Sequence, residues 1–190
     1  MTWATRITIL RLILVPVFVA FVITYDDSNP RAEIWRYAAI AIFTIAGLSD
    51  ALDGYLARHW NQGSALGALL DPVADKLLLL AALISLSFMP FAFPIWFPVI
   101  IISRDALLLM GYSVLRHFQV PMDIKPHWSG KLSTVFTLLA IGAVLFKLDS
   151  NVIISLCALG AGLALICTVI YVREGLALLK HGGHTSATNK

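Results

Sequence analysis

Six apolar runs dominate this sequence of 190 residues, and short breaks that contain charged residues or proline separate them. Each run is close to the roughly 20 apolar residues that a helix needs to cross a bilayer. Hydrophobic residues make up 59% of the chain and charged residues 13%, against about 45 to 50% and about 25% in soluble domains. The sequence therefore predicts an all-α polytopic membrane protein with spans at 7–25, 35–57, 67–88, 94–116, 130–146 and 152–171.

These runs leave no room for a second domain, so we expect one six-helix transmembrane domain over 1–180 and a disordered polar tail over 181–190. Basic residues are concentrated in the segments before the first span, after the second, between the fourth and fifth, and after the sixth. By the positive-inside rule, both termini face the cytosol. The expected location is a bacterial cytoplasmic membrane or its equivalent. The net charge of +3 is scattered and forms no patch, so we expect no nucleic-acid partner.

Four of the eleven acidic residues are gathered between positions 50 and 75, around the break between the second and third spans. Asp50 and Asp53 are three residues apart, and Asp71 and Asp75 are four apart, so each pair shares one face of a helix. The short connection between the two helices allows these two faces to meet. Four carboxylates at the edge of a bilayer repel one another and therefore require compensating positive charge.

Divalent metal ions are the compensation that this residue set favours. Carboxylate oxygens without His or Cys select Mg²⁺, Mn²⁺ or Ca²⁺. Four carboxylates can hold two such ions in the arrangement that stabilises both oxygens of a phosphoryl displacement. A structural alternative is a set of helix-capping acids, because Asp71 directly precedes a proline.

Small residues beside the acids leave room for a substrate. Gly54, Ala57 and Gly67 lie where a bulky side chain would block a nucleotide from approaching the helix backbone. Arg58 offers a planar fork of donors to a diphosphate, although it can also act as a topology anchor.

The pattern D-x2-D-G-x2-A-R-x8-G-x3-D-x3-D is complete here, and with it the chain resembles the CDP-alcohol phosphotransferases. The likeness extends to Thr8, Arg11 and Pro16 and to the segments around 103–105 and 125–131. It implies a homodimer of six-helix subunits in which Asp50, Asp53, Asp71 and Asp75 coordinate two Mg²⁺ or Mn²⁺ ions on the cytosolic side. Asp75 would also be the general base. Nucleotide and diphosphate contacts would come from Asp50, Gly54, Ala57, Arg58, Gly67 and Thr8, whereas Thr5 departs from the asparagine of many relatives.

The resemblance implies transfer of a phosphatidyl group from CDP-diacylglycerol to a glycerol-type acceptor, with release of CMP. Arg104, Lys131 and Lys125 are the candidate ligands for an acceptor phosphate. The Leu-Asp-Pro-Val-Ala-Asp-Lys run favours glycerol 3-phosphate, whereas Ser103-Arg104-Asp105 and Lys125-Pro126 are more typical of members that use phosphatidylglycerol, the cardiolipin synthases. Both acceptors remain open, with glycerol 3-phosphate preferred.

Several alternative interpretations accompany these assignments. A cation transporter would also place acids at membrane depth, but it would spread them along several spans. Arg104 and Lys131 can instead extend towards the interface, and Arg11 can contact a lipid headgroup. Cys157 and Cys167 are interpreted as small apolar fillers. Gly160 and Gly162 are expected to allow close helix packing.

Overall fold

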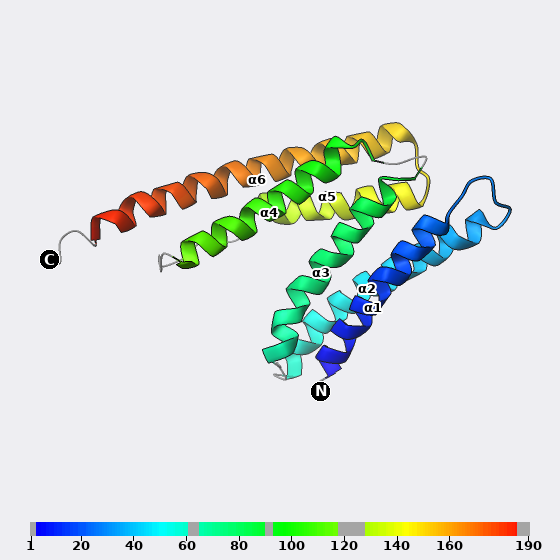
Figure 1. Cartoon of the computed structure of the whole chain (residues 1–190), viewed down its shortest axis with the longest axis horizontal. Helices are drawn as coiled ribbons and strands as arrows, with labels where there is room; N and C mark the ends of the chain where they lie inside the picture. The colour runs from blue at the N-terminus through cyan, green and yellow to red at the C-terminus, as the bar shows by residue number, and fades with distance from the viewer. Residues whose placement is uncertain (1–2, 61–64, 90–92, 118–127, 186–190) are drawn as a thin grey trace. The chain divides into compact units, whose positions relative to one another are not determined.

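The computed structural model describes residues 3–60, 65–89, 93–117 and 128–185, with side chains for 8–49, 76–89, 93–111, 113 and 128–176. Every regular element in these ranges is an α-helix, which confirms the all-α prediction (Figure 1). The helices are α1 (Trp3–Thr24), α2 (Ala32–Trp60), α3 (Ala65–Leu86), α4 (Trp96–His117), α5 (Trp128–Leu145) and α6 (Ser150–Thr185).

The first five helices match the predicted spans to within a few residues at each end. Helix α6 continues to Thr185, so it includes residues 181–185 of the segment that we predicted to be a disordered tail. Among the described residues, Trp128–Leu145 and Ser150–Leu176 are long and apolar enough to cross a membrane. Six crossings and cytosolic termini remain predictions.

The chain forms two compact units, and each is described by itself. The first contains α1, α2, α3 and residues 141–148 at the end of α5. The second contains α4, most of α5, and α6.

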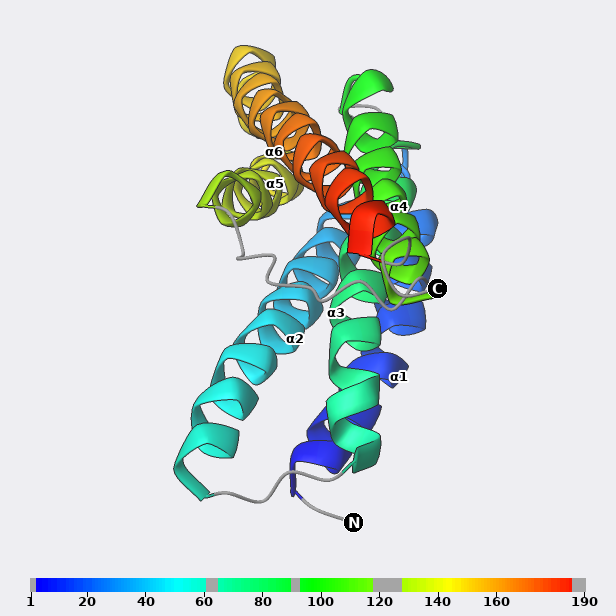
Figure 2. The same cartoon turned by 90° about the vertical axis from the view of Figure 1, so that its left-hand side faces the viewer.

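In the first unit, α1 packs against both α2 and α3 (Figure 2). Helix α2 has buried alanines at positions 32, 39 and 46, a spacing of two helical turns that places small side chains on one face. Ring contacts between Phe18 and Phe43 and between Phe21 and Trp35, with centroids 5.6 and 5.5 Å apart, set the register of the antiparallel pair α1 and α2.

In the second unit, α4 packs against α6, and a close contact joins α5 to α6 (Figure 1). A Cβ added at Gly160 would lie 3.3 Å from the Phe136 Cβ, and the Ser133 hydroxyl donates to the Gly160 carbonyl at 3.0 Å. The prediction of close packing is confirmed at Gly160. Among the described residues it is not confirmed at Gly162, where a Cβ would meet nothing within 4 Å.

Helix α5 ends in a Schellman motif, in which Lys147 has a positive φ of 52°. The Leu148 amide donates to the Ala143 carbonyl at 2.9 Å, and the Lys147 amide donates to the Val144 carbonyl at 3.0 Å. Two residues further on, a carboxylate oxygen of Asp149 accepts from the Asn151 amide at 3.3 Å and caps the start of α6. Backbone hydrogen bonding therefore determines the direction of the chain at this turn.

Candidate active site

The acidic motif lies on the two helices that the sequence predicted. Asp50 and Asp53 belong to the last part of α2, and Asp71 and Asp75 belong to the first part of α3. Both spacings are therefore helical, which supports the prediction that each pair shares one helix face. The side chains of residues 50–75 lie outside the described residues, so the meeting of the two faces remains a prediction. The same holds for the assigned roles of Gly54, Ala57, Arg58 and Gly67.

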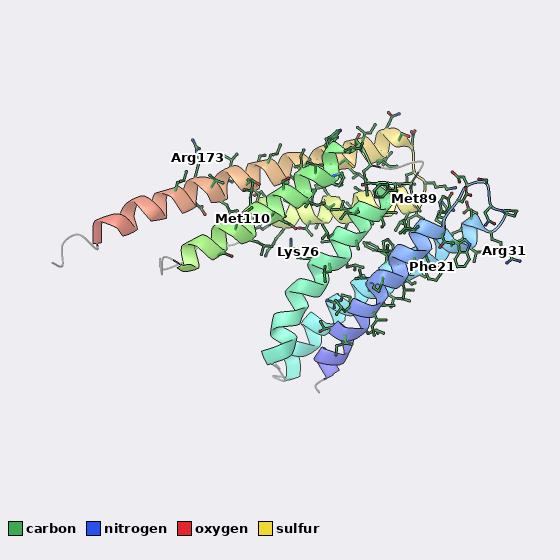
Figure 3. The ribbon with its side chains drawn as sticks, in the orientation of Figure 1. Phe21, Arg31, Lys76, Met89, Met110 and Arg173 are labelled. Atoms are coloured by element: carbon green, nitrogen blue, oxygen red, sulfur yellow. The ribbon has the colours of Figure 1, made fainter. Side chains whose placement is uncertain are left out.

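One described neighbour of the motif is Lys76, which follows Asp75 directly on α3 and is exposed (Figure 3). One ammonium group cannot balance four carboxylates. Lys76 alone therefore does not remove the predicted requirement for additional cations.

Helix α1 changes character along its buried face. Phe18 and Val22 are buried near its end, whereas the equally buried positions near its start are Thr8 and Arg11, each with 1% exposure. Because the ring contacts pair Phe18 and Phe21 with the first half of α2, the antiparallel register places Thr8 and Arg11 level with the acidic end of α2. The polar part of α1 and the motif thus share one end of the first unit.

The burial of Arg11 contradicts its interpretation as a lipid headgroup contact. Sequence reasoning missed its alternative role as a buried cation beside the acid-bearing helices. Its separation from Thr8 was a usable signal, because residues three apart share a helix face, and Thr8 was already assigned to the site.

Arg104 on α4, a predicted acceptor ligand, is buried with 8% exposure and does not extend into solvent. One terminal nitrogen donates to Asp105 at 3.0 Å. The other lies 3.4 Å from the Gly130 carbonyl and 3.7 Å from the Cys167 Sγ. Its buried Nε has no hydrogen-bond partner within the described part of the chain. We call Arg104, Asp105, Gly130 and Cys167 the Arg104 cluster.

The Arg104 cluster revises two sequence interpretations. Extension of Arg104 towards the interface is wrong, since the guanidinium is held among three helices. Cys167 is buried as expected, but it contacts a cation and is more than an apolar filler. Cys157 is buried and is consistent with a filler.

Of the other two candidate acceptor ligands, the structure describes only Lys131. Lys131 follows Gly130 in the first turn of α5 and is exposed, so its ammonium is available to a ligand. Lys125 lies outside the described residues. Arg104 and Lys131 belong to the second unit and the acids to the first, so their approach to one another remains part of the proposal.

A second charged group, which sequence reasoning did not identify as a unit, lies at the loop end of the first unit. The Lys147 Nζ is 3.2 Å from carboxylate oxygens of both Asp27 and Glu33. Glu33 also pairs with Arg36, whose second terminal nitrogen is 3.5 Å from the Leu145 carbonyl. We call Asp27, Glu33, Arg36 and Lys147 the Lys147 network.

The Lys147 network keeps its two carboxylates ionised. Hydrogen bonds from Tyr25 and then Lys147 hold the pKa of Asp27 below its ordinary value. The Lys147 ammonium does the same for the pKa of Glu33. Two cations and two anions balance one another here, so we interpret the network as a structural one that stabilises the fold.

The helical architecture and the carboxylate motif together define a class of protein, the helical phosphotransferases that act on activated alcohols. Residues 1–172 match the model of the CDP-alcohol phosphatidyltransferase family. The chain belongs to this family, and it is a transferase of phosphatidyl groups. Family membership also disfavours the cation transporter.

The named relatives include glycerol-3-phosphate 3-phosphatidyltransferases and a cardiolipin synthase. The chain is 38% identical over 149 residues to the CDP-diacylglycerol–glycerol-3-phosphate 3-phosphatidyltransferase of Haemophilus influenzae, covering 76% of this chain and 75% of that one. It is 35% identical over 148 residues to the cardiolipin synthase (CMP-forming) of Streptomyces coelicolor, covering 78% and 66%. The Escherichia coli glycerol-3-phosphate 3-phosphatidyltransferase is 31% identical over 148 residues, covering 75% and 76%.

Proposed function

We propose that this protein transfers the phosphatidyl group of CDP-diacylglycerol to glycerol 3-phosphate and releases CMP. It acts as an integral membrane enzyme of the bacterial cytoplasmic membrane, with its site on the cytosolic side, and as a homodimer. The observation that carries the proposal is the complete D-x2-D-G-x2-A-R-x8-G-x3-D-x3-D motif, which spans the end of α2 and the first part of the next helix, α3. The match to the family over residues 1–172 and the two long apolar helices support it.

The donor set of the motif fits divalent metal ions, since it consists of four carboxylates spaced along two helices and includes no soft ligand. Asp50, Asp53, Asp71 and Asp75 would hold two Mg²⁺ or Mn²⁺ ions. When bound, such ions stabilise the negative charge that develops on a diphosphate. Arg11 is buried near the start of α1, at the same end of the first unit as the motif, and adds a fixed positive charge to this region.

The chemistry is a single displacement at the phosphorus that bears diacylglycerol. Asp75 accepts the proton from the acceptor hydroxyl, whose oxygen forms the new bond to phosphorus. The bond from that phosphorus to the oxygen of CMP breaks, and CMP leaves with the bonding electrons. Arg58 donates to the diphosphate and stabilises the leaving group.

The acceptor is held by its phosphate. The buried Nε of Arg104 has no hydrogen-bond partner among the described residues, and the exposed Lys131 is next to Gly130, whose carbonyl Arg104 contacts. A guanidinium with a spare donor and a mobile ammonium are well suited to a phosphate monoester. Two named relatives use glycerol 3-phosphate, which favours this acceptor.

Cardiolipin synthesis from phosphatidylglycerol is the second candidate, favoured by the similarity to the Streptomyces coelicolor enzyme. The two acceptors are distinguished with purified protein, radiolabelled CDP-diacylglycerol and Mg²⁺ or Mn²⁺, supplied with either glycerol 3-phosphate or phosphatidylglycerol. We expect metal-dependent CMP release with glycerol 3-phosphate only. Release with phosphatidylglycerol alone would establish the second candidate, and equal release with EDTA would contradict the metal site.

The role of Asp75 is tested by Asp75→Asn, which removes the proton acceptor and preserves side-chain shape. We expect retained CDP-diacylglycerol binding and loss of transfer by at least about 100-fold. Asp149→Asn is the matched control, because asparagine caps a helix as well as aspartate does and Asp149 lies outside the motif. Wild-type turnover in Asp75→Asn would refute the assignment of the base.

A further inference from the structure

The Arg104 guanidinium occupies space that exists only because residue 130 is glycine. A Cβ built at Gly130 would lie 2.8 Å from the terminal nitrogen of Arg104, closer than real Cβ contacts permit, and 3.2 Å from the Cys167 Sγ. The same nitrogen is 3.4 Å from the Gly130 carbonyl. The first turn of α5 therefore accommodates the cation through the absence of a side chain.

Cys167 on α6 limits the guanidinium on a second side. Its Sγ lies 3.7 Å from the terminal nitrogen of Arg104, and the residue has no exposed surface. Asp105 holds the other terminal nitrogen at 3.0 Å. Backbone on α5, a thiol on α6 and a carboxylate on α4 thus determine the position of one charged group.

We propose that Gly130 and Cys167 are positioning residues that set where Arg104 presents its guanidinium to the anionic phosphate of the acceptor. This inference rests on the proposed function, in which Arg104 binds that phosphate. Neither residue contacts the reacting atoms, and both act through Arg104. Because the contact at 2.8 Å involves the far end of a flexible side chain, an added methyl group displaces the guanidinium, whereas the Cys167 Sγ at 3.2 Å needs to shift by only a few tenths of an ångström.

The first test is Gly130→Ala, assayed by steady-state kinetics against glycerol 3-phosphate and, separately, CDP-diacylglycerol. We expect the KM for the acceptor to rise about tenfold or more, as for a weakened charge-assisted hydrogen bond, with KM for CDP-diacylglycerol and the thermal midpoint almost unchanged. An unchanged acceptor KM would overturn the proposal. Failure of the wild type to use glycerol 3-phosphate would instead refute the proposed acceptor.

Two other glycines provide controls. Gly142→Ala changes the same helix at a position where a Cβ meets no described residue within 4 Å, so we expect wild-type kinetics. Gly160→Ala inserts a methyl group 3.3 Å from the Phe136 Cβ, away from Arg104, and should lower the thermal midpoint without a selective rise in acceptor KM. An acceptor-selective rise in KM in either control would contradict a role specific to Gly130.

The decisive test is a double variant. Cys167→Ala in the Gly130→Ala background opens space on the α6 side of the guanidinium, so Arg104 can move away from the added methyl group. We expect the acceptor KM to recover by about threefold or more relative to Gly130→Ala alone. A merely structural role for both residues predicts additive damage, and such additivity would overturn the proposal.

Discussion

The described part of the protein contains two buried arginines paired with carboxylates, Arg36 in the first unit and Arg104 in the second, and their surroundings differ. Arg36 belongs to the Lys147 network, where two cations face two carboxylates and the Leu145 carbonyl takes a further donor. Arg104 has one carboxylate, a backbone carbonyl and a thiol, the last two without formal charge. Both groups pair cations and carboxylates in equal number, so neither burial nor charge balance alone identifies a ligand-binding arginine; the groups differ in that Glu33 is shared between Arg36 and Lys147 within a larger network.

We expect the two groups to serve different purposes, the Lys147 network in stability and the Arg104 cluster in ligand binding. Removing a buried group from a balanced network leaves other members poorly paired, so the expected damage is to stability. Removing Arg104, which the proposed function assigns to the acceptor phosphate, deprives that phosphate of a partner, so the expected damage is to binding. The following variants test this division.

The largest effect is expected for Arg104→Met, which keeps the apolar part of the side chain and removes the guanidinium. The kcat/KM for the acceptor should fall by about 100-fold, with a small change in thermal midpoint. Kinetics and thermal unfolding in detergent measure both quantities. A large loss of stability with an unchanged kcat/KM per folded molecule would show that Arg104 has a structural role instead.

Arg36→Met is the matched change in the first unit. It leaves the Leu145 carbonyl without its donor and Glu33 without one of its two cations, so the free energy of unfolding should fall by about 2 kcal/mol. Activity per folded molecule should remain within about twofold of wild type, since Arg36 contacts no residue of the motif in the described structure. An acceptor-selective rise in KM would show that this arginine also serves the ligand.

Acid should weaken the Lys147 network. The pKa values of Asp27 and Glu33 are depressed in the folded state, so their contribution is complete above their ordinary values of about 4. It is lost as pH falls through the lower folded values, because both carboxylates then become neutral. Thermal midpoints measured from pH 7 to pH 3 should fall more steeply for wild type than for Lys147→Met. An equal fall of the thermal midpoint in both proteins would contradict a stabilising role for the Lys147 network.

The smallest effect is expected from the backbone of Lys147. Both Lys147→Gly and Lys147→Ala remove the contacts to Asp27 and Glu33, but only glycine adopts a φ of 52° without steric cost. The glycine variant should therefore be more stable than the alanine variant by about 1 kcal/mol. Unfolding in denaturant measures the difference. Equal stability would indicate that the Schellman motif changes when the ammonium is lost.

Much of the fold was predictable because apolar runs of this length form helices wherever they lie in the chain. The predicted span 94–116 and the observed α4 at Trp96–His117 differ by two residues or fewer at each end. The end of α6 was predicted less well, since its polar residues can continue a helix that an apolar pattern alone would stop. The spacing of the four aspartates also predicted their helices correctly. The Lys147 network was harder to predict, because Lys147 is more than 100 positions from Asp27 and Glu33 in the sequence.

The sequence by itself determined the helices, the acidic motif and the family, since each depends on local periodicity or on residues at short, fixed spacing. Only the tertiary structure showed that Arg11 is buried and that Arg36 is balanced by charge. Likewise, only the structure showed that Arg104 lies against Gly130 and Cys167. The physical reason is that burial and charge pairing depend on which helices pack together, and this packing cannot be read from the local pattern of one amino-acid sequence.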